Sequence, residues 1–141
     1  MKQTILFLFL IIVLSSCDIG RTSSKERMET VSKVKLPKDF IVLRDEYDDM
    51  IQDYGIVYDI QLNQKSADEY ADSIKHSIFF NPDVINKGTM YDSFYVMIDS
   101  TKSVWCKSTN GYMFAHENGN TKFRIWFDTL SNKVSYEETE Y

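Results

Sequence analysis

The chain has 141 residues, of which 21 are acidic and 16 basic, and a formal net charge of −5. A chain of this length forms one small domain with one core. The charge is uneven, since residues 18–38 carry a net charge of +3 and residues 39–141 a net charge of −9. The acidic part argues against nucleic-acid binding, which needs a positive surface to neutralise phosphates.

The first seventeen residues have the pattern of a signal peptide. Lys2 supplies a positive charge, and residues 5–14 form an uninterrupted apolar run of ten. This run is too short to cross a bilayer, which takes about 20 residues, and it has the length of a signal-peptide core. A buried core helix would carry polar residues at intervals, and this run has none.

The end of this segment, Leu14-Ser15-Ser16-Cys17, resembles the lipobox of bacterial lipoproteins. In that class of protein the cysteine is diacylated and becomes the new N-terminus. The resemblance implies that residues 1–16 are removed as a signal peptide. Acyl chains on Cys17, palmitate among them, would then hold the chain on a membrane of the cell envelope, with the domain outside the cytoplasm. The residues leave open whether this is the inner or the outer membrane.

Residues 17–38 are predicted to form a lipidated, flexible tether. Apolar side chains are few there and follow no period, and Pro37 marks the end of the segment. A basic tether beside anionic lipids is electrostatically favourable, although a plain polar linker would have the same composition. The rest of the chain, residues 39–141, is predicted to form a single small domain.

The predicted domain begins with two strands. Residues 40–43 form a short apolar strand, and residues 45–53 form an acidic hairpin connection or loop. In residues 55–62, apolar and polar side chains alternate, which predicts a second strand with one buried face.

A helix is predicted to follow. Ser66 and Glu69 have the spacing of a capping box, which predicts that Ser66 caps the helix. The apolar stripe of this helix consists of Ala67, Tyr70, Ala71, Ile74 and Ile78. The pair Asn81-Pro82 is expected to end it.

Three turn signals predict a four-stranded meander over residues 103–139. Asn110-Gly111 and Asn118-Gly119 are typical of two-residue hairpin turns, and residues 129–132 fit a four-residue connection. These turns pair Trp105 with His116, Phe114 with Phe123, and Asp128 with Lys133. Alternating apolar residues in 93–99 predict another strand before the meander.

These registers sort the side chains of the meander into two faces. The aromatic face collects Trp105, Tyr112, Phe114, His116, Phe123, Ile125, Phe127, Val134 and Tyr136. The mixed face collects Cys106, Met113, Ala115, Lys122, Arg124, Trp126 and Glu137. A slip of one residue would mix the two sets. We therefore predict an α+β fold in which a single helix packs on the aromatic face of a mostly antiparallel sheet, in the order β-β-α-β-β-β-β-β.

No motif in the sequence assigns a catalytic or metal site. His116 opposite Trp105 is a candidate for a pocket, although such a histidine more often packs at a core edge. His76 and Asp72 fit a solvated i,i+4 pair. The acidic side chains of residues 45–53 come as adjacent pairs, without the alternation and central glycine of a calcium loop. The sequence predicts neither a metal nor a cofactor.

The two cysteines are predicted to differ, with Cys17 acylated and Cys106 a free thiol. With Cys17 acylated, Cys106 has no intramolecular partner, so no disulfide is expected even where the compartment allows one. A lone cysteine is most often a small buried hydrophobe, and a nucleophilic one needs a positive or histidine-containing setting.

The mixed face offers a candidate interaction patch of Trp126, Arg124, Met113 and Lys122, since Trp and Arg are enriched at binding hot spots. Alternatively, residues 40–62 cover this face as a second layer. We predict a non-enzymatic envelope lipoprotein that binds a protein or another envelope component, in one version as an inhibitor or immunity-type protein that neutralises a basic partner. Two alternatives are a small hydrolase or ligand-binding pocket around His116 and a purely structural envelope component.

Overall fold

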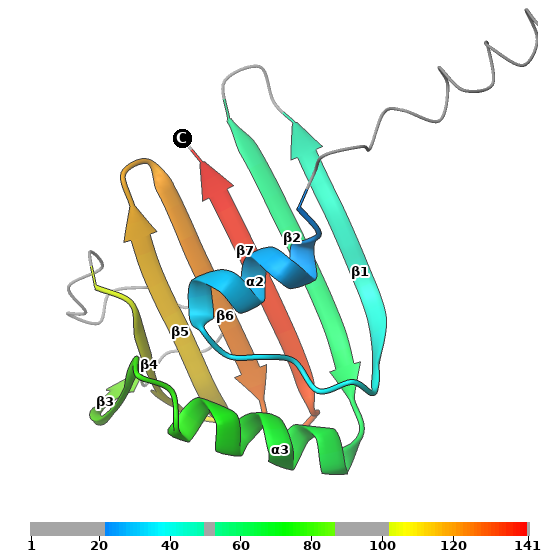
Figure 1. Cartoon of the computed structure of the whole chain (residues 1–141), viewed down its shortest axis with the longest axis vertical. Helices are drawn as coiled ribbons and strands as arrows, with labels where there is room; N and C mark the ends of the chain where they lie inside the picture. The colour runs from blue at the N-terminus through cyan, green and yellow to red at the C-terminus, as the bar shows by residue number, and fades with distance from the viewer. Residues whose placement is uncertain (1–21, 50–52, 87–101, 141) are drawn as a thin grey trace, which may run out of the picture.

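A seven-stranded sheet with two helices on one of its faces makes up the described part of the chain (Figure 1). The structure is a computed structural model, and it describes residues 22–49, 53–86 and 102–140. The elements in chain order are α2 (Ser24–Ser32), β1 (Phe40–Asp49), β2 (Tyr54–Leu62), α3 (Gln64–Lys75), β3 (Phe80–Asn86), β4 (Val104–Ser108), β5 (Gly111–Asn118), β6 (Thr121–Asp128) and β7 (Lys133–Glu140). The predicted α+β class is confirmed.

The strands follow one another across the sheet in the order β1-β2-β7-β6-β5-β4-β3. All neighbouring pairs are antiparallel except β3 and β4, which are parallel. Strands β4 to β7 form the predicted meander, and β2 pairs with β7. The expectation that residues 40–62 form a second layer is therefore wrong, because β1 and β2 extend the same sheet sideways.

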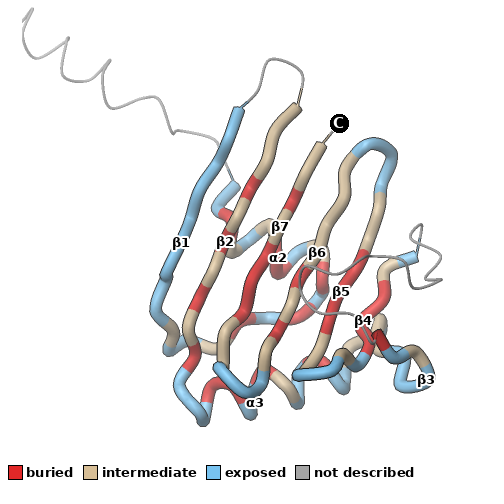
Figure 2. Tube along the Cα trace, turned by 180° about the vertical axis from the view of Figure 1, so that it is seen from behind, coloured by how far each residue is buried: buried red, intermediate tan, exposed pale blue. Residues whose placement is uncertain are grey.

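The core lies between the sheet and the two helices, where the buried stretches of the strands concentrate (Figure 2). Tyr70 of α3 meets Phe127 edge to face with ring centroids 5.2 Å apart, and Trp105 lies against Phe114 at 5.3 Å. The predicted alternation in β2 is confirmed, because Ile56, Tyr58, Ile60 and Leu62 are all buried. The aromatic face of the meander packs against the helices as expected.

The N-terminal helix α2 contradicts two predictions, a flexible tether over residues 17–38 and a single helix in the fold. The Ser23 side chain caps α2 by accepting a hydrogen bond from the Glu26 amide at 3.2 Å. Met28 is fully buried, and Val34 and Leu36 beyond the helix are also in the core. A polar nine-residue helix with one fully buried apolar side chain produces no visible apolar period, so tertiary packing decides this element.

Strand β1 is longer than predicted, because residues 45–49 of the acidic segment are paired strand and not a loop. The pairing with β2 runs from Phe40 opposite Leu62 to Asp49 opposite Tyr54, with an irregularity at Leu43. Strand β1 lies at the edge of the sheet, and its carboxylates are exposed to solvent. The strand therefore carries them without any cost of desolvation.

Helix α3 begins and ends earlier than predicted. Asn63, and not Ser66, is the N-cap, and its side-chain oxygen accepts a hydrogen bond from the Ser66 amide at 2.9 Å. The helix ends at Lys75, so Ile78 lies beyond it and is 83% exposed. The other residues of the predicted stripe contact the core.

The two tight turns of the meander are each displaced by one residue. Ser108 pairs with Gly111 and Asn118 with Thr121, so Trp105 lies opposite Phe114, and Phe114 opposite Ile125. Moving a two-residue turn by one position shifts the pairing by two, which returns every side chain to its original face. The predicted faces are therefore confirmed although two of the three registers are wrong.

The third register is confirmed, since Asp128 pairs with Lys133 as predicted. The strand predicted over residues 93–99 lies outside the described residues. In the described chain, the strand that precedes the meander in sequence is β3, which pairs with β4 in parallel.

We predict that Gly111→Ala destabilises the protein strongly. Gly111 has φ +153°, and a Cβ there would lie 2.0 Å from the Phe127 carbonyl oxygen. The clash forces β5 and β6 apart, and we expect a loss of about 3 kcal/mol or more in urea unfolding. Gly119→Ala is the control, because its φ is +60° with open space around the position, and it should cost about 1 kcal/mol. Equal losses in the two variants would contradict this account.

Candidate functional site

A buried carboxylate joins the N-terminal helix to the sheet. Glu138 of β7 is 1% exposed, and the Arg27 Nε of α2 donates to its Oε2 at 2.8 Å. A second guanidinium nitrogen of Arg27 and the Tyr54 hydroxyl both donate to Oε1. The Tyr136 hydroxyl donates to Oε2. We call these four residues the Glu138 cluster.

Hydrogen bonding decides the charge state of this cluster. Burial by itself would raise the pKa of Glu138, but the hydrogen bonds from Arg27, Tyr136 and Tyr54 outweigh it and hold that pKa below its ordinary value. Burial and the neighbouring carboxylate raise the pKa of Tyr54 to about 12. The cluster is therefore a carboxylate with one guanidinium and two neutral phenols at physiological pH.

The Glu138 cluster has the chemistry of a structural junction. Both carboxylate oxygens already accept two hydrogen bonds each, so neither is available as a base toward a ligand. The other end of α2 is also held, because the Trp105 indole donates to the Ser32 carbonyl at 3.3 Å. Helix α2 is thus bonded to the sheet through Arg27 and through its last residue, Ser32.

The structure does not place the two pocket candidates opposite each other. Trp105 is fully buried in the core, and the residue opposite it is Phe114. His116 is half-buried, and its ring stacks on Phe123 with centroids 5.6 Å apart. The Nδ1 atom of His116 lies 3.2 Å from the Ser103 hydroxyl oxygen. His116 therefore packs at the end of the aromatic face, beside a serine that the sequence did not single out.

The candidate interaction patch is only partly accessible. Met113 is 3% exposed, and its sulfur accepts a hydrogen bond from the Asn86 side chain at 2.9 Å, so its inclusion in an exposed patch is wrong. Trp126, Arg124 and Lys122 are half-buried on the same face.

The free cysteine is inert. Cys106 is fully buried on the mixed face, and this burial raises the pKa of its thiol to about 11. A thiol with this pKa remains protonated at neutral pH and is a poor nucleophile, because the thiolate is the reactive form.

Neither of the remaining acidic features forms a metal centre. His76 and Asp72 are an exposed pair with 3.5 Å between Nδ1 and Oδ2. In the acidic segment, Glu46 pairs with Arg44, and Asp45 accepts a hydrogen bond from the Ser24 hydroxyl at 2.6 Å. Within residues 22–49, 53–86 and 102–140, no group of three or more His, Cys, Asp or Glu side chains is placed to hold a metal ion.

Sequence reasoning missed the most unusual surface of the domain, the outer edge of β1. Every residue of β1 after Phe40 is exposed, although the strand is paired along its length with β2. Three consecutive aliphatic residues are among them: Ile41 is 66% exposed, Val42 49% and Leu43 55%. Four carboxylates follow within the same strand at Asp45, Glu46, Asp48 and Asp49. We call residues 41–49 the β1 edge.

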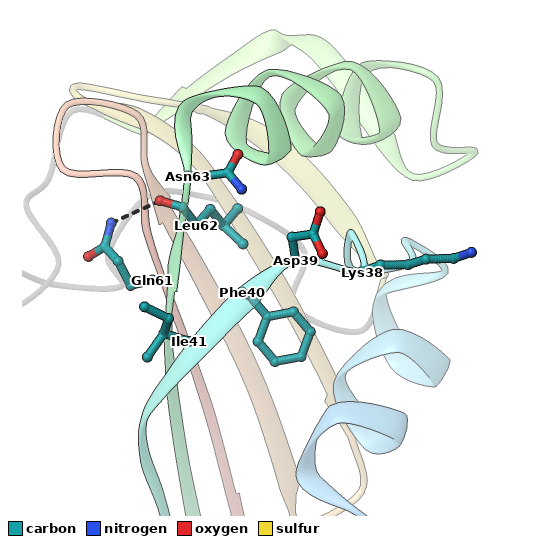
Figure 3. A pocket seen from close by; sticks show the side chains of 7 residues that line it. All are labelled: Lys38, Asp39, Phe40, Ile41, Gln61, Leu62 and Asn63. Carbon is teal, nitrogen blue, oxygen red and sulfur yellow. Dashed lines mark hydrogen bonds between the residues drawn. The ribbon is translucent and has the colours of Figure 1, made fainter.

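A shallow hollow of about 430 Å³ adjoins the start of the β1 edge (Figure 3). Its lining residues are Lys38, Asp39, Phe40, Ile41, Gln61, Leu62 and Asn63. The Gln61 amide is tied to the Ser131 carbonyl at 2.7 Å and to the Leu62 carbonyl at 3.2 Å. The hollow has a mixed apolar and polar lining, and it shares Phe40 and Ile41 with β1.

Comparisons of the chain with protein-family models, with curated proteins and with solved structures find no match. In the described part of the chain, neither helix is long and apolar enough to cross a bilayer.

We predict that Glu138→Gln destabilises the domain by about 3 kcal/mol in urea unfolding at pH 7, because it leaves Arg27 without its buried counter-charge. The pKa of Glu138 is lower in the folded state than in the unfolded chain, so this stabilisation is present above the unfolded pKa and is lost as the pH falls through the folded one.

The difference between wild type and Glu138→Gln should therefore shrink as the pH falls below about 4.5, the ordinary pKa of the group. Glu69→Gln on the exposed face of α3 is the control, and we expect a change within about 0.5 kcal/mol at any pH. A difference that stays constant down to pH 2 would contradict the assigned charge state.

Proposed function

We propose that the protein is a lipid-anchored lipoprotein of the bacterial cell envelope whose acidic domain binds a protein partner or another envelope component and performs no catalysis. The β1 edge is the observation that carries the binding role, since it combines exposed aliphatic side chains with a row of carboxylates. Neighbouring exposed apolar side chains rimmed by charged ones are typical of interaction sites.

The lipobox-like Leu14-Ser15-Ser16-Cys17 supports the anchor. Only six residues, 18–23, separate Cys17 from the first residue of α2. Even fully extended, such a segment reaches about 20 Å. The anchored domain would therefore stay close to the membrane, in contrast to one on the longer tether that composition suggested.

A hydrolase centred on His116 is the alternative with a specific observation in its favour, the 3.2 Å contact between His116 and Ser103. A serine nucleophile requires a base that is itself oriented by a third group, and no hydrogen bond from the described residues orients the other nitrogen of His116. Labelling with a fluorophosphonate that wild type takes up and Ser103→Ala does not would favour this alternative over the binding module.

A purely structural envelope component is the other alternative, and it requires the same anchor. It differs from the binding module in one respect, since no surface of the domain would engage a partner. Crosslinking from the exposed surface of the anchored chain separates the two, because only the binding module would yield a crosslinked partner.

We predict that Cys17→Ala abolishes incorporation of labelled palmitate and releases the protein from the membrane fraction, because the acyl chains supply the membrane affinity. Cys106→Ala is the matched control. Its thiol is buried and protonated, so this variant should be labelled and fractionate as wild type does. Palmitate labelling that persists in Cys17→Ala, or membrane retention without it, would overturn the proposed anchor.

A further inference from the structure

The two edges of the sheet differ in their capacity to accept another strand. The edge strand β3 contains Pro82, which has no amide hydrogen, and its pairing with β4 is irregular between Phe80 and Ile85. The opposite edge strand, β1, has ten residues with neither proline nor glycine. Proline on an edge strand blocks the addition of another strand, so β1 is the edge that remains open.

From this asymmetry we infer that β1 accepts an extended segment of a partner protein, which adds to the sheet as an eighth strand. The inference deepens the proposed binding function and rests on it. In strand addition, main-chain hydrogen bonds to the open edge supply affinity, and alternate side chains supply specificity. The β1 edge offers both, because its outer side faces no other strand in the described chain.

The side chains of the β1 edge define the chemistry of the partner segment. Its first part presents Ile41, Val42 and Leu43, which are each about half exposed or more. Its second part carries Asp45, Glu46, Asp48 and Asp49, while Arg44 is paired with Glu46. A complementary segment therefore has apolar residues at one end and lysine or arginine at the other.

A second copy of this chain fits the β1 edge poorly. In an antiparallel pair centred on the strand, the carboxylates of one copy would face the aliphatic residues of the other. In a parallel pair in register, carboxylates would face carboxylates, and like charges directly opposite each other are destabilising. Charge complementarity thus favours a basic partner over self-association.

Edge strands are also protected by charges and bulges, and β1 has both, with a register shift between Val42 and Arg44. Protection alone leaves the exposed aliphatic residues unexplained, because a guarded edge gains nothing from three consecutive large apolar side chains in solvent. A partner that covers them accounts for both halves of the strand.

The test uses the full lipidated chain in zwitterionic nanodiscs, so that a basic probe is not drawn to the lipid. The probe is a fluorescent ten-residue peptide with alternating lysine and threonine in its first half and alternating valine and threonine in its second. We expect saturable binding, with hydrogen exchange slowed over residues 40–49 and unchanged over residues 80–86. A peptide with glutamate in place of lysine should bind at least tenfold more weakly.

Variants of the exposed surface make the test specific. Leu43→Glu and the double variant Asp48→Lys with Asp49→Lys should each weaken binding of the lysine peptide at least tenfold, and the double variant should gain affinity for the glutamate peptide. Leu130→Glu is the matched control, since Leu130 is 79% exposed in the turn between β6 and β7, and it should bind as wild type does. No binding, or equal binding by all variants, would overturn strand addition at β1.

Photo-crosslinking in cells separates this inference from the proposed function. A crosslinker placed at Leu43 of the full chain should capture a partner. The additional substitution Ile41→Glu, at a neighbouring position, should prevent this capture. Capture from Trp126 but not from Leu43 would leave the binding module standing and overturn strand addition at β1. Capture of a second copy from Leu43 would overturn the basic partner, and capture from neither site would overturn both proposals.

Discussion

The buried carboxylate on β7 imposes a constraint on the whole domain. Glu138 is 1% exposed, and a buried charge without partners would cost several kcal/mol, so the fold must bring donors to it. Two tyrosines come from the sheet itself, but the counter-charge comes from Arg27, which is 111 residues away in sequence. Helix α2 is therefore an integral part of the domain, and the sheet depends on the N-terminal segment for its electrostatic balance.

The elements defined by local periodicity could be predicted from the sequence. In β2 and in the meander, side chains alternate with period two, and errors in turn position shifted the pairing by two residues without changing the faces. The apolar stripe of α3 was likewise visible, although local hydrogen bonding moved its cap from Ser66 to Asn63. In each of these elements one face is buried, so apolar residues recur in the sequence at a regular spacing.

Elements held by isolated contacts could not be predicted in this way. Helix α2 has Met28 as its one fully buried apolar side chain, and its other attachments include Arg27 and the Ser32 carbonyl, neither of which is apolar. The β1 edge was missed for a related reason. Whether a strand lies at the edge of a sheet depends on the strand order, and an apolar run such as residues 41–43 reads as buried until that order is known.

The position of α2 also bears on how the β1 edge would face its surroundings. The Ser24 hydroxyl, at the start of α2, bonds to Asp45 at 2.6 Å, so the end of the chain that leads to Cys17 lies beside the acidic part of β1 (Figure 1). With Cys17 acylated and only six residues between it and α2, Asp45 would lie near the membrane. Anionic headgroups repel carboxylates within about 8 Å at physiological salt, so such an anchor would favour orientations that keep the carboxylates of β1 away from the lipid. A basic segment bound along β1 under the proposed strand addition would cover the exposed aliphatic residues and would also relieve the repulsion between these carboxylates and the lipid.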